Sequence, residues 1–90
     1  MRLQKTVIEV YNDDNSAVDV VCRWYINEFI SEKTTIDDMR EFYTFDEVVE
    51  CDFSFAESGE KVNDIALLEQ AKQQLWDGDI YDKFYQYAED

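Results

Sequence analysis

The amino-acid sequence predicts a small α+β protein with one domain over residues 1–90. Two runs, residues 3–11 and 45–56, have the β-branched and aromatic composition of strands, whereas the segments between and after them carry apolar residues at helical spacing behind capping residues. A length of 90 residues allows one domain. The hydrophobic fraction of 46% is too high for a disordered acidic tail. The expected order is β-α-α-β-α-α, with a small antiparallel sheet covered by helices on one face.

The first half of the chain predicts a strand, a turn and a long helix. Residues 3–11 form the strand, and the polar residues 12–15 form the turn. Ser16 with Asp19 resembles a capping box and predicts a helix that ends near residues 31–33. Apolar side chains recur at helical spacing in this segment: Val18, Val21, Cys22, Tyr25 and Phe29. A second apolar stripe indicates a central helix that faces a partner in part, and it leaves a homodimer open as an alternative.

The middle of the chain predicts a short helix and the clearest strand. Thr35 with Asp38 forms a cap pattern for a helix that ends at Phe42. In residues 45–56 the side chains alternate, which implies a sheet covered on one face only. Phe45, Val49, Cys51, Phe53 and Phe55 are expected on the covered face, and Asp46, Glu50, Asp52 and Ser54 on the other, with Val48 among them.

The last third predicts two helices. Asn63 or Asp64 caps a helix that ends at residues 77–79, with Gly78 in the left-handed C-cap position. Asp79 then caps a short helix over residues 80–88. Because two strands make a marginal sheet, either a third strand lies in residues 39–45 or 60–67, or helices do most of the covering.

The charge balance excludes several classes of function. The chain has 22 acidic and 8 basic residues, a net charge of −14, and no His. Direct binding to nucleic acid is therefore very unfavourable, and His-based catalysis and His-ligated metal sites are absent. Since no apolar run approaches ~20 residues and the N-terminus lacks a signal-peptide core, we expect a soluble cytoplasmic protein without membrane contact. No catalytic motif is present, so we do not expect an enzyme.

The two cysteines and the acidic turns do not predict a cofactor. Cys22 and Cys51 lie within apolar patterns and are expected to be buried free thiols, although a disulfide stays open as an alternative. Residues 12–15 and 77–79 resemble fragments of calcium loops but lack the EF-hand spacing. Helix capping explains both segments, and we expect no metal.

The acidic residues are concentrated in one part of the chain. Residues 1–12 have a net charge of +1, residues 13–60 of −11 and residues 61–90 of −4. Seven acids fall within sixteen residues: Asp37, Asp38, Glu41, Asp46, Glu47, Glu50 and Asp52. Alternate strand residues lie ~6.6 Å apart, close to the spacing of about 6–7 Å between phosphates along a nucleic-acid strand. This block is a candidate contact face for a basic partner, and a solvated face that aids solubility is the alternative.

A second group of candidate contact residues lies near the C-terminus. Exposed aromatic residues beside acids are favoured at protein interfaces. The candidates are Trp76, Asp79, Tyr81, Asp82 and Tyr85.

In length, charge, its acidic block from Asp37 to Asp52 and its acidic aromatic C-terminus, the chain resembles a class of small phage-encoded inhibitors that imitate nucleic acid. This class includes anti-restriction proteins, anti-CRISPR proteins and uracil-DNA glycosylase inhibitors. The resemblance implies a bacterial host cytoplasm and a basic target that normally holds DNA or RNA. Two other readings stay open: an immunity protein or antitoxin that neutralises one basic toxin, and an acidic accessory subunit.

Overall fold

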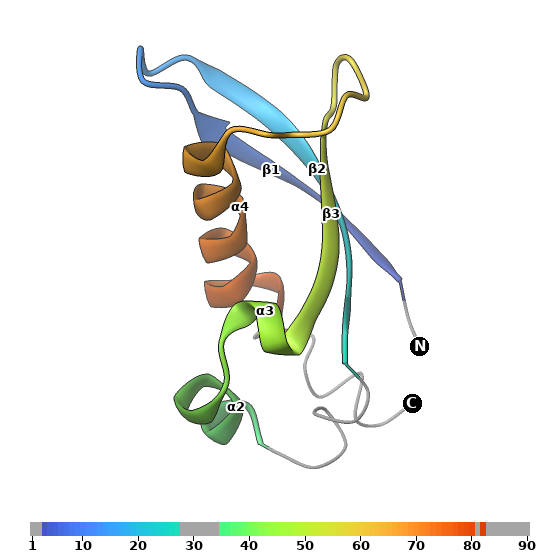
Figure 1. Cartoon of the computed structure of the whole chain (residues 1–90), viewed down its shortest axis with the longest axis vertical. Helices are drawn as coiled ribbons and strands as arrows, with labels where there is room; N and C mark the ends of the chain where they lie inside the picture. Colours follow the sequence, from blue (N-terminus) through green and yellow to red (C-terminus); the bar gives the residue numbers. More distant parts are fainter. Residues whose placement is uncertain (1–2, 28–34, 81, 83–90) are drawn as a thin grey trace.

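The computed structural model describes residues 3–27, 35–80 and 82, which form a three-stranded antiparallel sheet and three helices (Figure 1). The elements are β1 (Gln4–Tyr11), β2 (Ala17–Ile26), α2 (Ile36–Phe42), α3 (Phe45–Val48), β3 (Val49–Phe55) and α4 (Ile65–Asp77). The strand order is β1-β2-β3, so β2 is central. The predicted α+β class is confirmed, and α4 packs on one face of the sheet.

The long helix predicted after Ser16 is wrong, because this segment forms β2. β1 and β2 make a hairpin in which Val7 pairs with Val21 and Val10 with Val18. Asn15 adopts a φ of 67°, a left-handed conformation that Asn tolerates in turns. The two apolar stripes of the supposed helix are the two faces of a central strand. Its buried side chains recur every second residue: Val20, Cys22, Trp24 and Ile26.

The strand predicted over residues 45–56 begins at Val49, four residues later than expected. Phe45–Val48 form α3, which is closed by a capping box in which Glu47 accepts from the Thr44 backbone N–H at 3.0 Å. Asp46 and Phe45 are therefore on a helix and not on a strand. From Val49 onward the alternation is confirmed, with Glu50 and Asp52 exposed.

The sequence leaves open a third strand in residues 39–45 or 60–67, or helices that do most of the covering; neither segment forms a strand, and the third strand of the sheet is β2. Residues 39–42 belong to α2, whose predicted Thr35 cap is confirmed by the 3.2 Å bond from Asp38 N–H to Thr35 Oγ1. Lys61 makes only an isolated bridge to Ser54.

The core lies between the sheet and α4. Trp24 is fully buried at its centre, and α4 contributes Leu67, Ala71 and Leu75. The predicted start of α4 is confirmed, since Asp64 accepts hydrogen bonds from the backbone N–H groups of Ala66 and Leu67.

The end of α4 differs from the prediction in its cap. Gly78 has a φ of −115°, so the expected left-handed C-cap is wrong. Beyond it, Ile80 is buried and the Asp82 N–H donates to the Gly78 carbonyl at 2.9 Å. Most of the helix predicted over residues 80–88 lies outside the described residues, as does Phe29.

Within the described ranges, no helix has both the length and the hydropathy needed to cross a bilayer.

Candidate functional site

The outer edge of β3 is the first feature of the candidate site. Ala56 N–H donates to the Asp19 carbonyl at 3.0 Å, so the even-numbered residues of β3 direct their backbone groups toward β2. The odd-numbered residues direct theirs outward, where Val62 N–H reaches the Phe53 carbonyl at 3.0 Å. Before this point, the outward N–H and C=O of Cys51 have no partner among the described residues. Such an edge can accept a further strand or other donors from a partner protein.

A hollow of about 410 Å³ borders this edge, and three of the predicted acids line it. Asp46 reaches the hollow from α3, and Glu50 and Asp52 reach it from β3. The other lining residues are Val49, Cys51, Phe53, Lys61, Val62, Leu68 and Lys72. Asp46, Glu50 and Asp52 thus line one hollow together with apolar residues and two lysines. The carboxylate of Asp46 pairs with Lys72 of α4, whereas Glu50 and Asp52 lie on the open face of the sheet beside Tyr25 and Arg23.

Two of these acids are also engaged within the chain. Asp46 pairs with Lys72 at 3.1 Å, and Asp52 lies 3.9 Å from Arg23. Both carboxylates are well exposed, and ion pairs of this kind contribute little to stability. A partner's cation can therefore compete for them at small cost.

Glu50 accepts a hydrogen bond from the Tyr25 hydroxyl across the open face of the sheet. This bond raises the pKa of Tyr25, with burial and the Glu50 charge adding to the effect. The carboxylate of Glu50 is thereby held beside the edge and remains exposed.

The remaining acids of the predicted block lie elsewhere. Asp37, Asp38 and Glu41 are exposed on α2 and do not line the hollow. Asp37 and Asp38 occupy the first helical turn, where negative charge is favourable. Glu47 is exposed but serves the Thr44 capping box.

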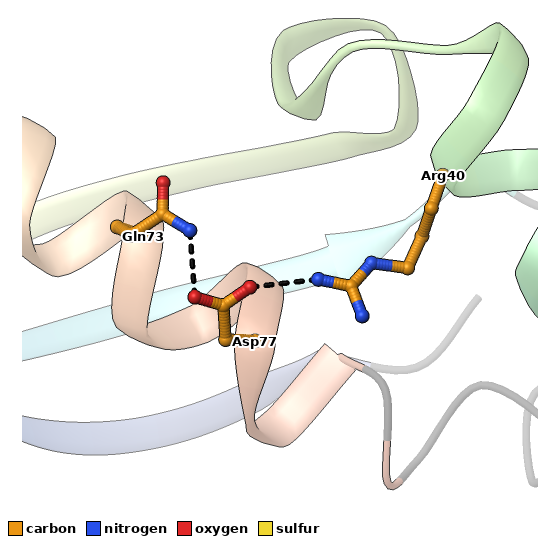
Figure 2. A network of polar contacts seen from close by, with 3 residues as sticks. All are labelled: Arg40, Gln73 and Asp77. Atoms are coloured by element: carbon orange, nitrogen blue, oxygen red, sulfur yellow. Dashed lines mark hydrogen bonds and ion pairs between the residues drawn. The ribbon is translucent and has the colours of Figure 1, made fainter.

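Side chains of α4 hold α2 and α3 beside the sheet. Arg40 on α2 donates to Asp77 at 2.7 Å, and Gln73 donates to the other oxygen of Asp77 at 2.6 Å (Figure 2). The Arg40 guanidinium also lies 5.9 Å from the ring centre of Trp76. Trp76, predicted as a contact residue, packs edge-on against Phe45 with ring centres 5.9 Å apart.

The other C-terminal candidates divide into two groups. Asp79 is half-buried and accepts a hydrogen bond from Thr6 Oγ1, and Asp82 is exposed. Tyr81 and Tyr85 lie outside the described residues. Neither Asp79 nor Asp82 lines the hollow beside β3.

Residues 35–61 carry nine exposed acids. In Figure 1 this segment runs from α2 at the lower end, through α3 and β3, to the turn at the upper end. We call its acids the acidic ridge: Asp37, Asp38, Glu41, Asp46, Glu47, Glu50, Asp52, Glu57 and Glu60. Glu57 and Glu60 are exposed in the segment that follows β3 and lie outside the acidic block from Asp37 to Asp52.

The ridge has only two basic residues within the same segment. Arg40 is engaged with Asp77, and Lys61 is exposed beside the hollow. Nine acids against two bases leave the segment with a net charge of −7. An acidic strip of this kind attracts a basic surface and repels nucleic acid.

Neither cysteine has the properties of a nucleophile. Burial raises the pKa of Cys22 to about 12, and the charges of Cys51, Asp52 and Asp79 add to the rise. Burial also raises the pKa of Cys51 to about 11, although the positive charge of Lys72 opposes this rise. Both thiols are free, but only Cys22 is fully buried, so the expectation of two buried thiols holds for Cys22 alone. In the described part of the chain, no three acidic or cysteine side chains are grouped in a way that would hold a metal ion.

Comparison of the chain with protein-family models, curated proteins and solved structures finds no match.

Proposed function

We propose that this protein is an inhibitor that binds a basic nucleic-acid-binding protein by presenting the acidic ridge in place of DNA or RNA. The target class comprises restriction, CRISPR and repair proteins, and the site of action is the bacterial cytoplasm. Association would be accelerated by charge, because the ridge and the cationic channel of the target attract each other at long range.

One observation supports this proposal above the others: Asp46, Glu50 and Asp52 all line one hollow beside the outward backbone groups of Cys51, which have no partner among the described residues. The lining of this hollow combines acidic with apolar residues next to those backbone groups, so the same place offers charge, apolar area and hydrogen bonds to a partner. Arg and Lys side chains that normally contact phosphates could enter it.

Recruitment of a partner from bacterial lysate, with and without competing duplex DNA, tests the proposal. We expect wild-type protein to retain a basic DNA-binding protein that the duplex displaces. A variant with Glu50→Lys and Asp52→Lys should lose this partner, because two attractive charges become repulsive at the centre of the site.

A matched control carries the same change in charge away from the ridge. Asp13→Lys and Glu69→Lys alter exposed residues of the hairpin turn and α4, and this variant should retain the partner. Equal loss in both variants would show that net charge alone drives retention. A single partner that resists the duplex would favour the alternative of a cognate immunity protein or antitoxin.

A further inference from the structure

The outer edge of β1 is open over a short stretch. At the C-terminal end of β1, the backbone N–H and C=O of Tyr11 are both hydrogen-bonded to the Gln70 side chain, each at 2.9 Å, so they are not available to another strand. Gln74 likewise donates to the Glu9 carbonyl at 2.8 Å. Below these contacts, the outward N–H and C=O of Lys5 and Val7, and the N–H of Glu9, have no partner among the described residues. Among the described residues, α4 thus covers one end of this edge and leaves the other end without a partner.

Like charges face each other across β1 and β2 on the open face of the sheet. Lys5 pairs directly with Arg23, and Glu9 pairs directly with Asp19. Both are pairs without backbone hydrogen bonds between the two residues, in which side chains approach most closely. Like charges in this position destabilise a sheet. An opposite charge on the outer side of β1 would reduce the electrostatic repulsion within each pair.

The sequence of β1 supplies those charges when two copies pair. With Val7 opposite Val7 of a second copy in an antiparallel ladder, Lys5 lies opposite Glu9, and Leu3 opposite Tyr11. Leu3, Val7 and Tyr11 are large exposed apolar residues, with Val7 58% exposed. In this register charged side chains meet opposite charges, and apolar side chains meet apolar side chains.

Other registers do not satisfy this pattern. A pairing centred on Lys5 or Glu9 puts two like charges face to face, and one shifted by a single residue puts Glu9 opposite Leu3 or Lys5 opposite Tyr11. The register centred on Val7 also uses most of the groups without a partner: each Val7 exchanges N–H and C=O with its copy, and each Glu9 N–H meets the Lys5 carbonyl. The Lys5 N–H meets the Glu9 carbonyl, which also accepts from Gln74, and Tyr11 keeps its bonds to Gln70, so the backbone ladder runs from Lys5 to Glu9.

We propose that the protein forms a symmetric homodimer through antiparallel pairing of β1 with β1 of a second copy, in the register centred on Val7. The two sheets become one sheet of six strands in the order β3-β2-β1-β1-β2-β3. This interface uses the part of the chain with the least negative charge, since residues 1–12 have a net charge of +1. The acidic ridges lie at the two outer ends, where their mutual repulsion is weakest.

Exchange of the two charges provides the test. Sedimentation velocity of the full chain, up to about 1 mM and at physiological salt, measures self-association over the range of weak dimers. We expect Lys5→Glu and Glu9→Lys each to weaken the dimer about tenfold or more, because each pair occurs twice in the dimer. The double variant, Lys5→Glu with Glu9→Lys, should restore it. An equimolar mixture of the two single variants should form a mixed dimer.

Two controls distinguish an effect on the pairing register from an effect of net charge or of unfolding. Lys61→Glu makes the same charge change as Lys5→Glu at an exposed residue away from β1, and it should leave the dimer unchanged. Circular dichroism reports whether each variant retains the fold. A wild-type chain that stays monomeric throughout, or a double variant no better than the single ones, would overturn the proposal.

Discussion

Thr6 and Asp79, which are 73 residues apart in the sequence, are joined by a 2.7 Å hydrogen bond between Thr6 Oγ1 and Asp79 Oδ2. The same hydroxyl accepts from the Trp24 indole at 3.1 Å. The hydroxyl of Thr6 therefore connects β1 to the central strand β2 and to the segment that follows α4.

Removing this hydroxyl should destabilise the fold. We expect Thr6→Val to lower the free energy of unfolding by about 1–2 kcal/mol, because a part-buried carboxylate loses its donor and the indole loses an acceptor. Urea unfolding followed by tryptophan fluorescence measures the change. Asp79→Asn, which keeps an oxygen acceptor, should cost less than Asp79→Ala. Equal stability of Thr6→Val and the wild type would show that the bond contributes nothing.

The contact between Arg40 and Asp77 should be measurable as a pairwise coupling. In a double-mutant cycle with Arg40→Ala and Asp77→Ala, we expect a coupling of about 0.5 kcal/mol, which is typical of a partly exposed ion pair. The Arg23–Asp52 pair is longer at 3.9 Å and more exposed on its basic side, so its cycle should give a smaller value. The reverse order would mean that the 2.7 Å geometry does not determine the strength of the pair.

The cysteines should differ in reactivity toward alkylating reagents. Burial raises the pKa of both thiols, to about 12 for Cys22 and about 11 for Cys51, so both should react slowly at pH 8 in the folded protein. Cys51 is half-buried and should be labelled before Cys22. Mass spectrometry of a time course identifies the order. Fast labelling of Cys22 in the folded state would contradict its burial.

The same pKa shifts predict a dependence of stability on pH. An unfolded thiol ionises near pH 9, whereas the folded thiols stay protonated until about pH 11–12. Their contribution to stability is thus fully present below about pH 9 and is lost as the pH rises toward 12. Relative to the wild type, Cys22→Ala should show a shallower decline of stability between pH 9 and 11. Parallel curves would rule out this contribution.

The sequence predicted the fold class and several local features because these depend on near neighbours. The strand at residues 4–11, the Thr35 cap and the Asp64 cap each follow from residues within one turn or one alternation. Residues 17–26 were misread because an apolar strand that is central in the sheet has apolar residues on both faces, which also fit a helix. This segment forms a strand because β1 and β3 pair with it on both sides, and such pairing depends on tertiary structure and not on the local sequence.

The candidate site was predictable in composition but not in arrangement. The charges of Glu50 and Asp52 and their exposed face follow from alternation. The position of Asp46 on a helix that returns to the same hollow, and its pairing with Lys72, depend on the packing of α3 against α4. No local pattern encodes that contact.

The central claim is that the acidic ridge, and not the overall charge, binds the basic partner. The most direct measurement is the affinity of the recruited partner for two triple variants of equal charge across a salt series. One variant neutralises the ridge with Glu41→Gln, Glu50→Gln and Glu60→Gln; the other neutralises exposed acids elsewhere with Asp13→Asn, Asp19→Asn and Glu69→Gln. We expect the ridge variant to bind about tenfold more weakly with a shallower salt dependence, and the other to stay within about twofold of the wild type. Equal affinities for the two variants would contradict the claim.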